Sequence, residues 1–454
     1  MQKFIFIVIA LLSVILYLCA PYSYSWSYCA LCAVIYVINA TIGLIPVMKK
    51  NLICFSFFFS LTLFFCSFLF PLVIYPVDRS YSLFSFGYNA NVITKCTALV
   101  LFAHSIYWVG HIRGANKVFS KFFFSNTQIT DKTINIFTVL VAFAFVAFIS
   151  LGGLTYFTDR YIGGVMSINP AFQYLNVFFS TIVITLACML VYAKKKATFL
   201  RACVILGVIT ITILSTGSRT IPMYIFLPLL YVVKNRFKLS TLTLVWIMLV
   251  IFVAFASIGS IRNQEITIDS LLAFDSSTKQ LGYIENLSDF IINNRNLYAI
   301  YDYVENNDIL YGVNFLGALL SIIPFAQSFV SRFFGIPAYE FSSDTFCTHL
   351  VFGARPPLGL GTHVVGDVYL ATGIIGLIVL FYFLGFFMSK LSNSIKYNRC
   401  HFMQITYLYI LSYSIFMCRG TFFGPIKGII WAGFFIYLIN RFTLNSRNSN
   451  RQFN

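Results

Sequence analysis

The residues best suited to chemistry lie in the second half of the chain. His363 and Asp367 stand four residues apart in the glycine-rich segment GLGTHVVGDVY (359–369), directly before a long apolar stretch. If a helix has begun at that point, residues four apart share one of its faces. An imidazole oriented by a neighbouring carboxylate is well suited to general base catalysis. We therefore expect His363 and Asp367 to form a proton-accepting site.

Three arginines stand at the ends of apolar stretches: Arg219 in TGSRT, Arg262 in GSIR and Arg419 in CRG. A planar guanidinium makes bidentate hydrogen bonds to phosphate and keeps its charge when desolvated, unlike a lysine ammonium. Of the nine basic residues on the same predicted side of the membrane, eight are arginines. The three arginines therefore favour a polyanionic ligand such as a phosphate or diphosphate.

The TGSRT turn offers more than a charge. Gly217 suits a left-handed helix end, and Ser218 or Thr220 suits the cap of the next helix, which carries Pro222 near its start. The free N–H groups of that helix start would point at the same anion as Arg219. We accordingly add Ser218 to the predicted anion-binding residues.

Simpler interpretations exist for each of these residues. A single arginine at the end of a span often snorkels to the interface or pairs with a nearby acid. His363 and Asp367 are equally compatible with a capped helix start whose polar side chains are solvated. The sequence alone leaves these alternatives open.

The elements that position these residues are membrane helices. The chain has 454 residues, of which 59% are hydrophobic and 10% charged, whereas soluble domains carry about 25% charged residues. The apolar runs are continuous over about 20 residues, which excludes the alternating strands of a membrane barrel. We predict an all-α polytopic protein with about twelve spans, at 3–20, 27–48, 52–75, 92–110, 134–152, 171–193, 199–216, 220–233, 239–259, 365–388, 402–418 and 422–440.

The distribution of charge orients these spans. With the N-terminus inside, the cytoplasmic turns hold 20 Lys and Arg and one acid, while the external turns hold nine basic and 13 acidic residues. This is the positive-inside pattern, and it places both termini in the cytoplasm. It also explains most of the net charge of +17 without nucleic acid. Charge counting cannot decide whether the first span is cleaved as a signal peptide, since cleavage would leave the topology unchanged. We expect a retained anchor, because polytopic proteins seldom need a separate signal.

The predicted organisation has three parts. Residues 1–259 form spans one to nine, 260–364 form a large external loop with interfacial helices, and 365–454 form the last three spans and a basic tail. The loop region up to Asp367 holds 11 of the 14 acids. Residues 309–334 are apolar but interrupted by Pro324, so we expect an amphipathic or re-entrant piece against the outer leaflet.

Together, in this order and on this side, TGSRT (216–220), YGVNFLGALLSIIP (311–324), GLGTHVVGDVYLATGIIG (359–376) and CRG (418–420) resemble motifs of the Wzy-type O-antigen polymerases. The resemblance spans about residues 210–440. It implies a C-type glycosyltransferase (GT-C) fold that polymerises undecaprenyl-diphosphate-linked repeat units into a surface polysaccharide such as that of lipopolysaccharide. The reaction takes place at the outer face of the bacterial inner membrane.

The resemblance also implies roles for individual residues. Arg219, Arg262 and Arg419 would stabilise the departing lipid diphosphate, and His363 or a loop carboxylate would take the proton of the attacking sugar hydroxyl. Family members often carry Ser and Glu where this chain has His363 and Asp367. The shorter acid leaves the identity of the base open.

Two rival functions remain at this stage. An O-antigen ligase uses the same donor but delivers the glycan to lipid A core, and a flippase would bind the diphosphate in transit. A transporter is expected to place ionisable groups near the bilayer midplane, whereas here they gather at one interface. We expect no cofactor and identify no metal ligands, since no ligand cluster of recognisable spacing occurs; whether a metal takes part is open. The expected partners are the lipid-linked glycan and membrane lipid; whether a chain-length regulator binds is open.

Overall fold

The computed structural model describes residues 2–49, 51–79, 87–119, 128–154, 170–261, 288–354, 356, 359–397 and 400–452. Within these ranges all regular structure is helical, and no strand occurs. The expected all-α class is therefore confirmed. Helices satisfy their backbone polar groups internally, as continuous apolar runs in a membrane require.

Helices occupy all twelve predicted apolar stretches. They are α1 (Gln2–Leu18), α2 (Trp26–Met48), α3 (Phe55–Leu69) with the π-turn η1 (Phe70–Ile74), α4 (Ile93–Gly114), α5 (Asp131–Ser150), α7 (Pro170–Met189), α8 (Lys196–Leu214), α9 (Thr220–Phe237), α10 (Thr241–Ile261), α17 (Val364–Tyr397), α18 (His401–Tyr413) and α19 (Gly424–Gln452). Between α10 and α17 lie α13 (Ser288–Asn306), α14 (Val313–Leu320), α15 (Ala326–Phe334), η5 (Ala338–Phe341) and α16 (Ser343–Phe352).

Seven helical segments of the described chain are long and apolar enough to cross a membrane. They are Trp26–Met48, Phe55–Ile74, Ala90–Gly114, Asp131–Ser150, Tyr174–Tyr192, Lys196–Leu214 and Val364–Ile395. Lys3–Leu18 and Thr241–Ile251 are shorter apolar helical segments, so length and composition of the described residues establish a multi-pass membrane protein but not the number twelve.

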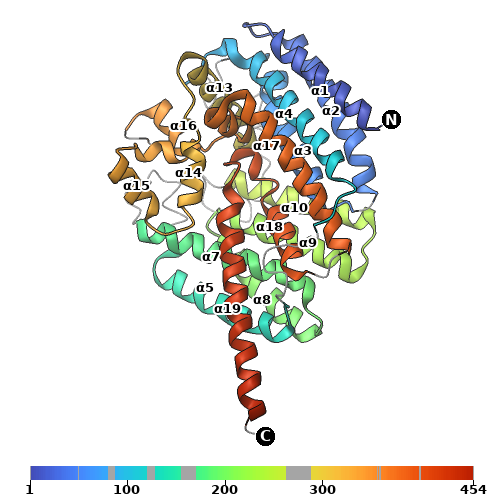
Figure 1. Ribbon diagram of the computed structural model, residues 1–454, viewed down its shortest axis with the longest axis vertical. Helices are drawn as coiled ribbons and strands as arrows, with labels where there is room; N and C mark the ends of the chain where they lie inside the picture. Colours follow the sequence, from blue (N-terminus) through green and yellow to red (C-terminus); the bar gives the residue numbers. More distant parts are fainter. Residues whose placement is uncertain are drawn as a thin grey trace. The chain divides into compact units, whose positions relative to one another are not determined.

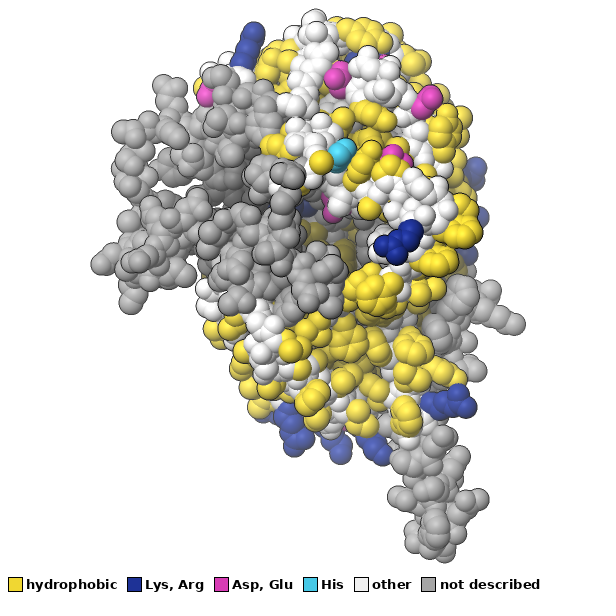
Figure 2. Space-filling view, turned by 90° about the vertical axis from the view of Figure 1, so that its left-hand side faces the viewer, with side chains coloured by type: hydrophobic (Ala, Val, Ile, Leu, Met, Phe, Trp, Pro, Cys, Tyr) yellow, Lys and Arg dark blue, Asp and Glu magenta, His cyan; other side chains and the backbone are white. Residues whose placement is uncertain are grey.

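The surface agrees with a membrane environment. Large apolar side chains are exposed on several of these helices, including Phe143 of α5 (73%), Ile211 of α8 (70%) and Ile375 of α17 (77%). Figure 2 shows a broad expanse of such side chains on one face. A soluble protein rarely exposes apolar patches of this extent. These helices therefore have lipid as their natural surroundings.

The chain divides into two compact units. Unit 1 comprises Met1–Lys121, Asp289–Arg399 and Tyr413–Lys427, and unit 2 comprises Phe122–Ser288, Cys400–Ser412 and Gly428–Asn454. In unit 1, α4 packs against α1, α2 and α17 (Figure 1). Of the candidate spans α4 is the most enclosed, with 83% of its most apolar window buried. It is thus the central helix of unit 1.

The contact between α4 and α17 depends on glycine. A methyl group on Gly110 of α4 would overlap the carbonyl oxygen of Tyr382, and one on Gly385 of α17 would overlap that of Tyr107. Gly114, four residues after Gly110, faces the carbonyl of Phe386 in the same way. Small residues at this spacing let two helix backbones touch, which is how membrane helices gain packing energy. The close crossing fixes the part of α17 that follows its break at Gly373, whereas Asp367 lies in the first turn, before that break.

Unit 2 is held by its own aromatic and polar contacts. The rings of Phe148 in α5 and Phe179 in α7 stack with centroids 4.7 Å apart. Thr133 of α5 donates to the Asn440 side chain of α19 at 3.0 Å. Within this unit, α5 also packs on α8, and α7 on α9. Unit 2 therefore has a core independent of the glycine contact in unit 1.

We predict that Gly110→Val will destabilise the protein, because the added side chain must separate α4 from α17. Overpacking of this kind costs about 1–3 kcal/mol. Gly207→Val in α8 is the matched control, since a Cβ added at Gly207 meets no atom within 4 Å. The midpoint of thermal unfolding in detergent should fall for Gly110→Val and stay near wild type for Gly207→Val. Equal midpoints would contradict the packing described for the two helices.

Candidate active site

Asp367 lies buried where three segments of unit 1 meet. Its side chain is 1% exposed. Oδ1 accepts a hydrogen bond from Nδ2 of Asn314 in α14 at 2.8 Å, and Oδ2 accepts one from the backbone N–H of Phe422 at 2.7 Å. Phe422 follows Arg419 by three residues. One carboxylate thus links the start of α17 to α14 and to the turn that carries Arg419.

A break in α17 positions α14. Gly373 has φ 64° and ψ −155°, which interrupts the helix after its first turns. The carbonyls of Leu370 and Ala371 accept hydrogen bonds at 2.8 Å from the N–H groups of Leu310 and Gly312. The segment leading into α14 therefore takes the place of the missing helical donors. This attachment is what places Asn314 within reach of Asp367.

His363 immediately precedes α17 and has no exposed surface. Its Nδ1 accepts a hydrogen bond from the backbone N–H of Val365 at 3.2 Å, and its Nε2 lies 3.0 Å from Oγ of Ser67 in α3. Because Nδ1 is an acceptor, the neutral ring carries its proton on Nε2 and donates it to Ser67. Burial lowers the pKa of His363 to about 3, which keeps the ring neutral.

The geometry differs from the sequence expectation in one respect. The Asp367 carboxylate is engaged by Asn314 and Phe422, and the His363 ring by Val365 and Ser67. The two side chains are close in sequence but have separate partners, so the structure does not show the carboxylate orienting the imidazole. His363 instead caps α17 through Nδ1, as one of the simpler interpretations supposed, although neither side chain is solvated.

Arg419 belongs to the short 3₁₀-turn η6 (Met417–Arg419) and is half-buried. Its guanidinium carbon lies 5.8 Å from the centroid of the Phe416 ring. Gly361, with φ +73°, lies so close that a Cβ there would be 3.7 Å from the Arg419 carbonyl oxygen. The glycine-rich segment before His363 therefore packs against the arginine turn, and the structure brings His363, Asp367 and Arg419 into one unit.

A buried polar cluster in α13 supports the same segment and was missed by sequence reasoning. Asn293, Asn294, Arg295 and Asn296 are all at most 1% exposed. Arg295 donates to the side chain of Asn296 at 3.1 Å, and Asn296 donates to the carbonyl of Leu360 at 2.7 Å. Four consecutive polar residues cover the whole circumference of a helix, so no apolar face marks them as buried. The run of four polar residues NNRN (293–296) is the sequence feature that could have predicted this cluster.

Ser218 and Arg219 belong to unit 2. Gly217 adopts the expected left-handed conformation, with φ 78°. The expected cap is wrong: α9 begins at Thr220, the capping position is held by Arg219, and no side chain there accepts from the helix N–H groups. Ser218 is 2% exposed and Arg219 is half-buried. Helix N–H groups that lack a side-chain cap remain suited to an anion.

Arg262 lies outside the described residues, so its role stays a prediction from the sequence. Among the residues that are described, no group of three His, Cys, Asp or Glu side chains is placed to hold a metal ion. In unit 1, the neutral imidazole of His363, the carboxylate of Asp367 and the guanidinium of Arg419 lie on segments that the Phe422–Asp367 hydrogen bond joins. Such a set can move a proton and hold an anion without a redox group.

We predict that Asp367→Asn will destabilise unit 1, because an amide group at this position leaves either the Phe422 N–H or one N–H of the Asn314 amide without its side-chain acceptor, although Asn314 also donates to the Asp367 carbonyl at 3.1 Å. A buried unsatisfied donor costs about 1–3 kcal/mol. The exchange Asn314→Asp with Asp367→Asn restores a donor–acceptor pair and should recover part of the loss in thermal unfolding experiments. Asp308→Asn, at an exposed position, is the control. A double variant no more stable than either single one would contradict this hydrogen-bond assignment.

Comparison with known proteins accounts for nearly the whole chain. The family model for O-antigen polysaccharide polymerase Wzy matches residues 2–448. No curated protein and no solved structure matches. The match includes the first five helices, for which the sequence motifs gave no more than hydropathy, as well as every candidate site residue. The chain therefore belongs to the Wzy family of O-antigen polysaccharide polymerases.

Proposed function

We propose that this protein is a GT-C-type glycosyltransferase that polymerises undecaprenyl-diphosphate-linked repeat units at the outer face of the inner membrane. The family match over residues 2–448 supports polymerase activity. The observation that carries the proposed site is the bond from Phe422 N–H to Asp367, because it joins the arginine turn to the start of α17. Anion binding and proton transfer thereby share one rigid support.

The proposed topology has twelve spans, with both termini in the cytoplasm and residues 260–364 in the periplasm. Helices lie on all twelve predicted stretches, and seven segments meet the length and hydropathy of a span. The basic residues alternate with these helices in the positive-inside sense. This topology places Arg219, His363, Asp367 and Arg419 at external helix ends.

In the proposed reaction, a hydroxyl of the incoming repeat unit attacks C1 of the sugar that is joined to the donor diphosphate. The new C–O bond forms as the bond from C1 to the diphosphate oxygen breaks, and the hydroxyl proton passes to the protein. Ser218, Arg219, Arg262 and Arg419 stabilise the charge on the leaving undecaprenyl diphosphate. Preorganised donors aimed at developing charge are usually the largest catalytic contribution.

The structure suggests how the two predicted catalytic residues divide their roles. Since Nε2 of His363 carries the proton in this structure, we assign His363 as a neutral hydrogen-bond donor to the substrate and Asp367 as the proton acceptor. Both side chains are buried. The acceptor hydroxyl must therefore reach them through a change of conformation. In that change the hydrogen bond between Nε2 of His363 and Ser67 breaks, and the substrate takes the place of Ser67. Such closure steps also exclude water from glycosyl transfer.

We predict that Arg419→Ala and Arg219→Ala will each lower polymerisation about 10²–10³-fold, as loss of a donor to developing charge usually does. Arg→Lys at either position should restore little, because the bidentate fork is lost. On a gel of surface glycan these variants should show single repeat units on lipid A core in place of a ladder. Arg113 is exposed in the last turn of α4, on the predicted cytoplasmic side, and Arg113→Ala should keep the ladder.

The same gel separates the rival functions. A ligase or flippase defect would remove even the single repeat unit from lipid A core. That outcome would refute the polymerase assignment, and an unchanged ladder in the Arg219 and Arg419 variants would refute their diphosphate role.

We predict that His363→Asn will lower turnover by about 10²-fold or more while the protein still folds. Asparagine is a preferred helix cap and replaces the Nδ1 contact with Val365, but it lacks a group at the position of Nε2. Ser67→Ala is the matched control, since it removes the same hydrogen bond and leaves Nε2–H in place. If His363→Asn and Ser67→Ala had equal, near wild-type turnover, His363 would be a helix cap only.

A further inference from the structure

The hairpin formed by α14 and α15 (residues 311–334) exposes aromatic side chains that the proposed reaction does not use. No side chain of α15 is buried. Phe329 and Phe333, one helical turn apart, are 70% and 73% exposed, and their rings stack with centroids 6.0 Å apart. Phe334 and Ile323 are exposed by 67% and 65%. Such a ridge is unfavourable in water and favourable in the interfacial layer of a membrane.

The two turns of this hairpin also carry exposed aromatic residues. Tyr311 and Phe325 adopt left-handed backbone conformations, with φ 47° and 65°, and are 75% and 62% exposed. Glycine or asparagine would normally occupy such positions, because a large side chain there is strained. Aromatic side chains at strained, exposed turns favour a contact between these rings and a molecule outside the protein.

The hairpin adjoins a helix that faces lipid. α14 packs against α17, a candidate span. Ile375, Val379 and Phe383, which share one face of α17, are exposed by 77%, 44% and 57%, and Leu319 of α14 by 51%. The apolar surface of the hairpin is thus an extension of the lipid-facing surface of unit 1. The occupant this continuity indicates is the membrane lipid itself.

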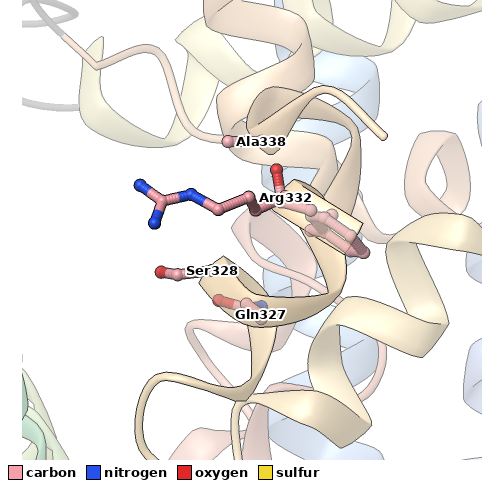
Figure 3. Close-up of a pocket in the computed structure, with 6 residues that line it drawn as sticks. Gln327, Ser328, Arg332 and Ala338 are labelled. Carbon is pink, nitrogen blue, oxygen red and sulfur yellow. The ribbon is translucent and has the colours of Figure 1, made fainter. Parts of the chain in front are cut away.

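The side of α15 that flanks this ridge is polar and hollowed, because Arg332 and Ser328 are neighbours of Phe329 on the helix surface. Gln327, Ser328, Ser331 and Arg332, with Ala338 and Phe341, line a pocket of about 450 Å³ (Figure 3). Gln327 and Ser331 donate to the carbonyls of Gly317 and Ile336, both at 2.7 Å, which fixes the pocket wall.

The pocket has a cation available for a ligand. The Arg332 side chain extends outward on the same side as Ser328 (Figure 3), and within the described part of the chain it has no hydrogen-bond or ion-pair partner. A guanidinium beside a hydroxyl is suited to phosphate.

We propose that the α14–α15 hairpin is a glycerophospholipid-binding element. The acyl chains lie along Phe325, Phe329 and Phe333, and the lipid phosphate is held in the pocket by Arg332 and Ser328. The element anchors unit 1 to the surface of one leaflet beside α17. Its operation requires a membrane but not the polymerase chemistry, so the two proposals stand or fall separately.

Photo-crosslinking in intact membranes tests the chain contact. The full-length protein carries p-benzoylphenylalanine at Phe329 or Phe333, with Ile375 as the lipid-facing control and buried Phe346 (5% exposed) as the negative control. After irradiation, mass spectrometry should find phospholipid adducts at 329, 333 and 375 and none at 346. Adducts at 375 alone, or adducts of 329 and 333 with an isoprenoid lipid or a protein, would overturn the proposal.

A second experiment tests the phosphate contact. Native mass spectrometry of the purified protein should show about tenfold less retained phospholipid for Arg332→Ala, since one charged hydrogen-bond pair is lost, and an intermediate loss for Ser328→Ala. Arg113→Ala is the control for removal of an exposed positive charge. Equal retention by the Arg332→Ala and Arg113→Ala variants would contradict the site.

Discussion

The direct contact of backbones between α4 and α17 is the constraint on which the candidate site depends. Gly110 and Gly385 leave no room for a side chain between the two helices, so the part of α17 after its break at Gly373 is fixed by the most enclosed helix of unit 1. The part before the break is attached to the segment leading into α14 through the carbonyls of Leu370 and Ala371. Within a membrane, helices gain nothing from burying apolar surface against each other beyond what lipid offers, and close packing must supply the energy. A buried carboxylate at the start of α17 needs a support of this rigidity to keep its donors in place.

Asp367 joins segments of unit 1 that are far apart in the sequence. Its two oxygens engage Asn314, 53 residues before it, and Phe422, 55 residues after it. The arginine turn, the α14–α15 hairpin and the start of α17 are therefore held by one group. A movement of the start of α17 that admits substrate to His363 would therefore also shift the turn that carries Arg419. In the proposed function, that coupling would link diphosphate binding to the readiness of the proton-accepting group.

Sequence reasoning located the helices well, because apolar runs of about 20 residues have few other outcomes. It also found the left-handed Gly217, which follows from a local rule. It did not find Asn314 or the α13 polar cluster as partners, since those contacts join residues far apart in the chain. The predicted Ser218 or Thr220 cap was wrong because α9 begins one residue later than a Ser218 cap would require, with Arg219 as its cap. Side-chain pairing inside a membrane protein is decided by tertiary packing, which local patterns do not encode.

The proposed function requires this protein to join lipid-linked repeat units by itself, without a nucleotide sugar. The direct measurement is reconstitution of the purified full-length chain in liposomes with one defined undecaprenyl-diphosphate-linked repeat unit. The expected result is a ladder of products, with release of one undecaprenyl diphosphate for each linkage formed. Intact substrate after incubation with folded protein, or a ladder only when nucleotide sugar is added, would contradict it.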